Sequence, residues 1–136
     1  MNRRKEESMS YYLGKTLPIA FDEAVARTME ALKKEGFGVL TEIDVKETLK
    51  KKIGVDFPSY RILGACNPAL AYEALKLENN VGTMLPCNVV VRDAGNGQTE
   101  VAAIDPVASM QAIDNPELKR AAEQVRAKLE RVIAAL

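Results

Sequence analysis

Hydrophobic and polar positions follow two periods in the first third of the chain. Residues 11–17 are aromatic and β-branched enough for a strand, which Pro18 ends. Over residues 21–32 the apolar side chains recur every three or four positions, which predicts a helix that ends at Gly36. Residues 37–43 return to the alternation of a short strand.

The middle of the chain repeats this change of period. Asp44, with Glu47 three residues on, resembles a capping box and predicts a short, Lys-rich helix that ends at Gly54. Residues 60–66 predict a third strand. Asn67 then predicts an N-cap, and Pro68 stands at the first position of the next helix.

The last third predicts a hairpin followed by a long helix. Residues 85–91 form an apolar run of strand length, residues 94–97 are turn-forming, and residues 99–104 predict the returning strand. Apolar side chains recur on one face from Leu118 to Leu136, after a proline in the first turn. The order of elements predicts an α+β fold with about five strands in a largely antiparallel sheet covered by helices.

The length of 136 residues fits one compact domain, which we place at residues 9–136. Residues 1–8 combine basic and acidic side chains without an apolar segment, which predicts a flexible N-terminal tail. Between residues 9 and 136 the pattern shows no linker and no low-complexity segment.

Charge and cysteine content narrow the partners and the compartment. Lys plus Arg equals Asp plus Glu at 19 each, so we expect neither nucleic acid nor a membrane as a partner. Charges interrupt every apolar run before it reaches the roughly 20 residues that span a bilayer. Two cysteines are too few for a disulfide framework. These features predict a cytoplasmic protein.

The chain contains no histidine, and this absence excludes several chemistries. Ser-His-Asp and Cys-His catalysis need an imidazole, and so does a mixed Cys/His zinc site. The sequence therefore identifies no catalytic residue, implies no cofactor and leaves open whether the chain is an enzyme.

Two Cys-Asn dipeptides are the candidate chemistry. Cys66 lies at a predicted strand-to-helix junction, where the helix dipole favours a reactive thiolate, although a cysteine there can equally be a small buried hydrophobe. Cys87 starts a strand that can neighbour the one ending in Cys66. Two thiols at one site can hold a soft ion such as Cu(I), form a redox couple or simply pack.

Three polar residues complete the candidate ligand-binding set. Asn67 and Asn88 follow the cysteines and can orient a ligand, although Asn67 also suits an N-cap. Asp105 is either a carboxylate presented at a strand end or a turn residue before Pro106. The run Lys50 to Lys52, with Arg61, can form an anion-binding edge or a solvated face.

Residues 60–68, residues 85–91 and the Ile104-Asp105-Pro106 turn resemble the domain-of-unknown-function 302 family over about residues 9–136. The resemblance implies a compact α+β fold of the TATA-binding-protein-like class and a homodimer. It implies no established activity and no catalytic residues. A similar fold does not confer DNA binding, because function resides in sites.

Three hypotheses follow. The first is a dimeric module that binds a small molecule or a soft metal near Cys66, Asn67, Cys87, Asn88 and Asp105. The second is a thiol redox enzyme or sensor that uses both cysteines. The third is a structural or protein-interaction domain without chemistry.

Overall fold

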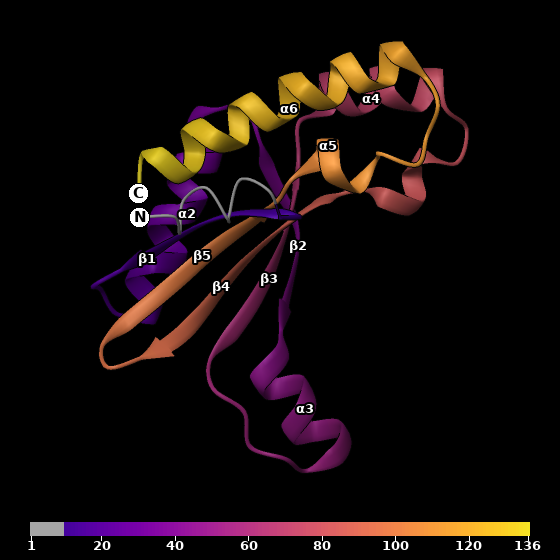
Figure 1. Cartoon of the computed structure of the whole chain (residues 1–136). Coiled ribbons are helices and arrows are strands. Elements are labelled where there is room, and N and C mark those ends of the chain that lie inside the picture. The colour runs from indigo at the N-terminus through magenta and orange to yellow at the C-terminus, as the bar shows by residue number, and fades with distance from the viewer. Residues whose placement is uncertain (1–9) are drawn as a thin grey trace.

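A computed structural model describes residues 10–136. The tail predicted at residues 1–8 lies outside the described residues. Within them, the alternation of strand and helix follows the sequence pattern closely (Figure 1). None of the helices in this range is long and apolar enough to cross a membrane.

The strands form one open, antiparallel sheet. They are β1 (Tyr12–Leu17), β2 (Gly38–Asp44), β3 (Tyr60–Cys66), β4 (Cys87–Gly95) and β5 (Gln98–Ile104). Their spatial order is β1-β5-β4-β3-β2, and every neighbouring pair is antiparallel. This confirms the predicted five-stranded sheet. It also makes β3 and β4 neighbours, with Ala65 opposite Cys87.

The helices are α2 (Phe21–Lys34), α3 (Val45–Ile53), α4 (Pro68–Leu77), α5 (Pro106–Ser109) and α6 (Pro116–Ala134), with a 3₁₀ turn, η1 (Val81–Met84). The sequence pattern predicts all of the longer ones. It predicts a loop where α5 lies, since four residues are too few to show a helical period.

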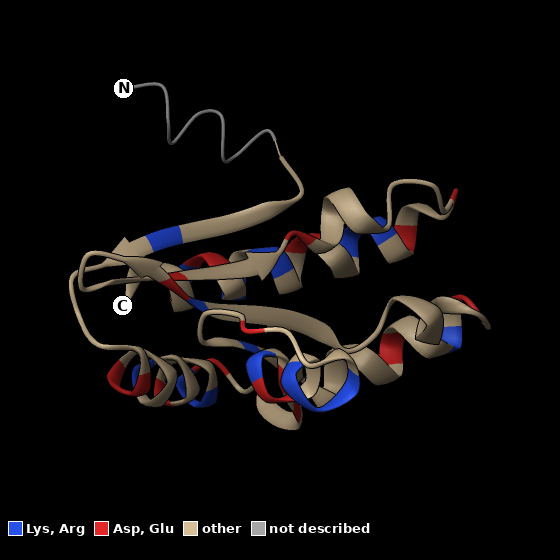
Figure 2. Ribbon diagram, turned by 90° about the horizontal axis from the view of Figure 1, so that it is seen from below, with Lys and Arg blue, Asp and Glu red and all other residues tan. Residues whose placement is uncertain are grey.

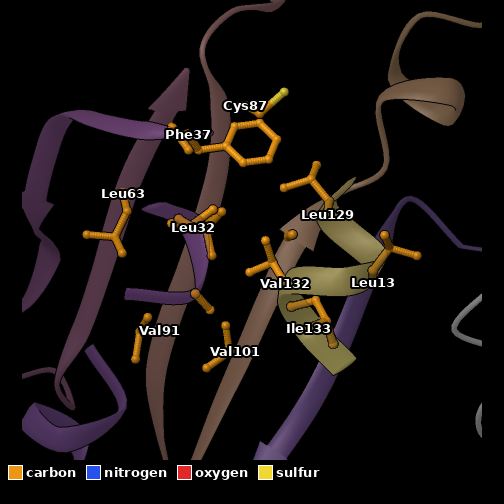
Figure 3. Close-up of a cluster of buried hydrophobic side chains, with 14 of the residues drawn as sticks. Leu13, Leu32, Phe37, Leu63, Cys87, Val91, Val101, Leu129, Val132 and Ile133 are labelled. Atoms are coloured by element: carbon orange, nitrogen blue, oxygen red, sulfur yellow. The ribbon is translucent and has the colours of Figure 1, made fainter. Parts of the chain in front are cut away.

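Helices α2 and α6 cover one face of the sheet and form the main core with it (Figures 1 and 3). Leu32 from α2 and Leu129 from α6 are fully buried against strand residues such as Leu63, Val89 and Val101. Burying each such side chain contributes roughly 1.5–3 kcal/mol. The opposite face of the sheet has no helix over it in the described chain.

A second, smaller core lies beyond the ends of the strands, where α4 runs beside the N-terminal half of α6 (Figure 1). Its buried members are Ala74, Val81, Met110, Leu118 and Ala122. Most of these side chains are small or flexible, and small side chains fill the interior less completely. A cavity therefore remains where the second core meets the first.

Helix α3 contributes no buried residue and projects from the far end of β2 and β3 (Figure 1). Asp44 caps it by accepting a hydrogen bond from the Glu47 backbone N–H at 3.0 Å. Gly54 ends it in the left-handed conformation, with φ of 71°. Both ends of this helix are where the sequence predicts them.

Candidate functional site

A pocket lies at the junction of the two cores, between the end of the sheet, α4 and α6; we call it the α4–α6 pocket. Its cavity measures about 50 Å³, several times the roughly 10–15 Å³ that one water needs. The walls are mainly apolar. They comprise Phe37, Ala65, Cys66, Asn67, Leu70, Ala71, Ala74, Leu85, Pro86, Cys87, Pro106, Met110, Leu118, Ala121, Ala122 and Val125.

Cys66 and Asn67 reach this pocket from the junction between β3 and α4. Asn67 is the N-cap of α4, and its Oδ1 accepts a hydrogen bond from the Leu70 backbone N–H at 3.2 Å. A Cβ atom added to Gly36 would lie 3.1 Å from the Asn67 side-chain nitrogen. Gly36 also has φ of 85°, so both its backbone and its surroundings favour glycine. The predicted cap is confirmed.

Cys87 lines the same pocket from the start of β4, close to the Phe37 ring (Figure 3). The residue is buried, with 7% of its surface exposed. Burial raises the pKa of the Cys87 thiol from 9.0 to about 11, and charge on Cys66 adds to the rise. A neutral, buried thiol is a poor nucleophile near neutral pH. This argues against Cys87 as one half of a redox couple.

Both cysteines are free thiols, and Cys66 is only half-buried. They reach one pocket from neighbouring strands, as the position of β3 beside β4 requires, but they do not form a close pair. The structure therefore places both thiols on one pocket without joining them. Within residues 10–136 there is also no cluster of three or more His, Cys, Asp or Glu side chains suited to a metal ion.

Asn88 does not join the pocket. Successive side chains of a strand point to opposite faces, so Asn88 lies on the uncovered face while Cys87 lies on the covered one. The second Cys-Asn dipeptide is thus divided between two surfaces, and only its cysteine faces the pocket.

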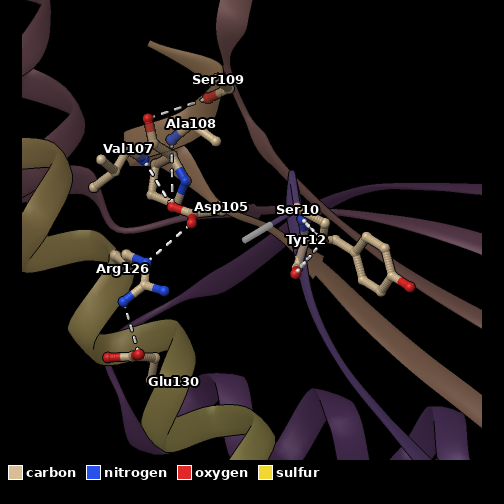
Figure 4. A network of polar contacts seen from close by, with 9 residues as sticks. Ser10, Tyr12, Asp105, Val107, Ala108, Ser109, Arg126 and Glu130 are labelled. Carbon is tan, nitrogen blue, oxygen red and sulfur yellow. Dashed lines mark hydrogen bonds and ion pairs between the residues drawn. The ribbon is translucent and has the colours of Figure 1, made fainter. Parts of the chain in front are cut away.

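Asp105 makes contacts that stabilise the fold (Figure 4). Its Oδ1 accepts hydrogen bonds from the Val107 and Ala108 backbone N–H groups at 2.9 and 3.4 Å, which caps α5. Its Oδ2 lies 3.0 Å from Nε of Arg126 on α6, and this hydrogen bond raises the pKa of the guanidinium. Arg126 also pairs with Glu130 at 2.8 Å. The turn-residue interpretation of Asp105 fits these contacts better than a free carboxylate.

Arg61 does not belong to an anion-binding edge with the lysine run. Its guanidinium pairs with Glu42 at 2.9 Å and with Asp44 at 3.7 Å, and it lies 5.4 Å from the centre of the Phe21 ring. These carboxylates offset its charge. The lysines of α3 are left as a separate group.

The uncovered face of the sheet carries a broad groove, which we call the open-face groove. It measures about 290 Å³, and its floor is formed by apolar, polar and charged side chains of β4 and β5. Aromatic pairs stand beside it: Tyr11 with Tyr12 at 5.2 Å, and Phe57 with Tyr60 at 6.0 Å between ring centres. The lining residues are Tyr11, Tyr12, Tyr60, Asn88, Val90, Arg92, Glu100, Ala102 and Ile104.

Sequence reasoning missed the helix side of the α4–α6 pocket. Ala71 from α4 and Ala121 from α6 line it, and each looks like an ordinary helix residue in the sequence. The available signal was the alanines on the facing sides of α4 and α6, where small side chains leave room between the backbones.

The fold and this pocket define a class: a small α+β domain with one open antiparallel sheet and an apolar cavity at the end of its core. The family model described as "Domain of unknown function DUF302" matches residues 13–136, and the chain belongs to this family. No curated protein matches the chain.

A solved structure supports the same conclusion. The crystal structure of an uncharacterized conserved DUF302 protein from Bacillus stearothermophilus is 32% identical in sequence, with a TM-score of 0.85. The match covers 92% of this chain and 97% of that one. The predicted family and fold class are therefore confirmed.

Proposed function

We propose that the chain is a small-molecule-binding module and that the α4–α6 pocket is its site. The observation that carries this proposal is a cavity with mainly apolar walls that lies between two cores and is reached by the half-buried Cys66. Ligand sites are typically concave and apolar with few polar groups. No Asp, Glu, Lys or Arg is among the lining residues, so a neutral, apolar ligand fits better than an ionic one.

A soft metal ion has less support as the ligand. The lining offers two thiols that do not form a close pair, and none of the other lining residues is a carboxylate. Soft ions prefer thiolates, whereas burial raises the pKa of Cys87 to about 11 and keeps it protonated.

Xenon tests the pocket because it is neutral, apolar and small. We expect xenon under pressure to shift the methyl NMR signals of pocket residues such as Ala65 and Ala122. Ala121→Leu places a larger side chain in the cavity and should abolish the shifts. Ala26→Leu on the exposed face of α2 is the matched control and should leave them unchanged.

Two outcomes would contradict the proposal that the α4–α6 pocket binds an apolar ligand. One is a wild-type spectrum in which xenon moves no signal from the lining residues. The other is an Ala121→Leu spectrum in which the same signals move as far as in the wild type.

We also propose that a second copy of the chain covers the open-face groove. Five strands about 4.8 Å apart, each about seven residues long, present roughly 500 Å² of flat area, and side-chain relief brings this toward the roughly 800 Å² per partner of a stable interface. Aromatic side chains, which are enriched in interfaces, stand beside the groove as Tyr12 and Tyr60 do.

Substituting Val90, on the floor of this groove, tests the dimer. We expect the wild type to sediment as a dimer and Val90→Lys to sediment as a monomer, because the added charge would be buried beside a Glu100 that is already paired with Arg92. Leu75→Lys, on the exposed face of α4, is the matched control and should remain a dimer. A monomeric wild type, or a dimeric Val90→Lys variant, would refute this interface.

A further inference from the structure

The α3 lobe, residues 45–57, exposes apolar side chains at the end of the molecule farthest from the α4–α6 pocket (Figure 1). Helix α3 has no buried residue. Ile53 is 67% exposed, Val55 41% and Phe57 40%, so three exposed apolar side chains lie within five consecutive residues of the projecting segment. Exposed apolar side chains that lie together indicate an interaction surface.

Lysines flank the apolar side of this helix. At 100° per residue, one stripe of α3 is apolar, and lysines stand on both edges of it. Figure 2, which looks at the molecule from the side where α3 projects, shows the gathering of basic residues. The stripe consists of Val45, Leu49 and Ile53, with Lys46 and Lys50 along one edge and Lys52 along the other.

Most of these lysines keep their charge available. Lys50 pairs with Asp56 at 3.0 Å, and both side chains are largely exposed. Within residues 10–136, Lys46, Lys51 and Lys52 form no ion pair and are exposed to solvent. The lobe therefore combines a positive field with an apolar tip, although the chain as a whole has no net charge.

We propose that the α3 lobe docks on an anionic lipid surface, with Ile53 and Val55 entering the headgroup region and the lysines contacting lipid phosphates. An amphipathic helix with lysines beside its apolar stripe is suited to lie in such an interface. A nucleic acid backbone would also attract the lysines, but it would leave Ile53 and Val55 in water. The apolar tip therefore favours lipid.

This proposal departs from the prediction, made from the charge of the whole chain, that a membrane is not a partner. That expectation rests on the balance of 19 basic and 19 acidic residues. The protein is larger than the distance of about 8–10 Å over which salt screens a charge, so carboxylates far from the lobe have little effect at the membrane. A basic lobe can therefore bind an anionic surface although the protein as a whole has no net charge.

Vesicle flotation with the full chain tests the proposal. We expect binding to vesicles of phosphatidylcholine with about one-third phosphatidylserine, and none to phosphatidylcholine alone, at low salt. Lys46→Gln with Lys52→Gln should weaken binding roughly 25-fold, at about fivefold for each lysine near the surface. Ile53→Ser with Val55→Ser should weaken it roughly tenfold or more through lost apolar contact.

Matched variants keep the test specific. Lys33→Gln with Lys34→Gln removes two exposed lysines from the end of α2, and Leu75→Ser removes an exposed apolar side chain from α4. Both should bind as the wild type does. Phe57 is left unchanged because its ring contacts Tyr60 in the open-face groove. Since the substituted side chains are exposed, the variants should retain the fold, which circular dichroism checks.

Three results would overturn the proposal. The first is an absence of binding to anionic vesicles at low salt. The second is equal loss of binding in the α2 lysine control. The third is binding to a DNA duplex that depends on Lys46 and Lys52 but not on Ile53 and Val55, which would make the lobe a nucleic-acid contact.

Discussion

Replacing Asp105 with alanine should lower the free energy of unfolding by about 2–4 kcal/mol. The substitution removes the cap of α5 and leaves the Arg126 guanidinium without its buried partner. We place the loss below the largest values known for buried pairs, because Arg126 is 25% exposed and still contacts Glu130. Urea denaturation followed by circular dichroism measures it.

Two further variants separate the parts of this effect. Asp105→Asn keeps an oxygen that can cap α5 but removes the charge, so its loss should be intermediate. Glu130→Gln removes only the exposed partner of Arg126 and should cost less than about 1 kcal/mol. A stability of Asp105→Ala equal to that of the wild type would show that this network does not hold α6 to the sheet.

Raising the pH from about 9 to about 11 should weaken the wild type relative to Cys87→Ala by up to about 2–3 kcal/mol. The pKa of Cys87 is about 11 in the folded chain against 9.0 for an ordinary thiol. Between these values the unfolded state loses the proton while the native state keeps it. The stabilisation is therefore complete below pH 9 and is lost as the pH rises through 11.

The measurement is urea denaturation of both proteins at several pH values. Every other ionisable group is common to both proteins, so its contribution cancels in the difference. Cys66→Ala removes the smaller cause of the raised pKa, so it should reduce the pH dependence only in part. A difference between wild type and Cys87→Ala that is constant with pH would contradict the buried, protonated thiol.

The local pattern of the chain was enough to predict most of the fold. Caps such as Asp44 and Asn67 act through backbone groups two or three residues away, so their role can be inferred from neighbouring sequence. The neighbouring position of β3 and β4 was only a possibility, because no local pattern shows which strands pair across an intervening helix.

The candidate site was predicted only in part, because its other contacts are long-range. Cys66, Asn67 and Cys87 do line one pocket, whereas Asn88 faces the opposite side of the sheet, as strand alternation requires. The partner of Asp105 is Arg126, 21 residues away on a helix whose angle to the sheet no local pattern gives. The wall formed by α4 and α6 depends on the same angle.

The position of β1 in the sheet has a consequence for how the chain is made. β1 is an edge strand whose partner is β5, with Tyr12 opposite Ile104 and Leu17 opposite Thr99. During synthesis it must wait until residues 98–104 have left the ribosome, while β2 and β3 can pair much earlier. The order of strands in the sheet therefore lets β2 and β3 pair early and requires the N-terminal strand to pair late.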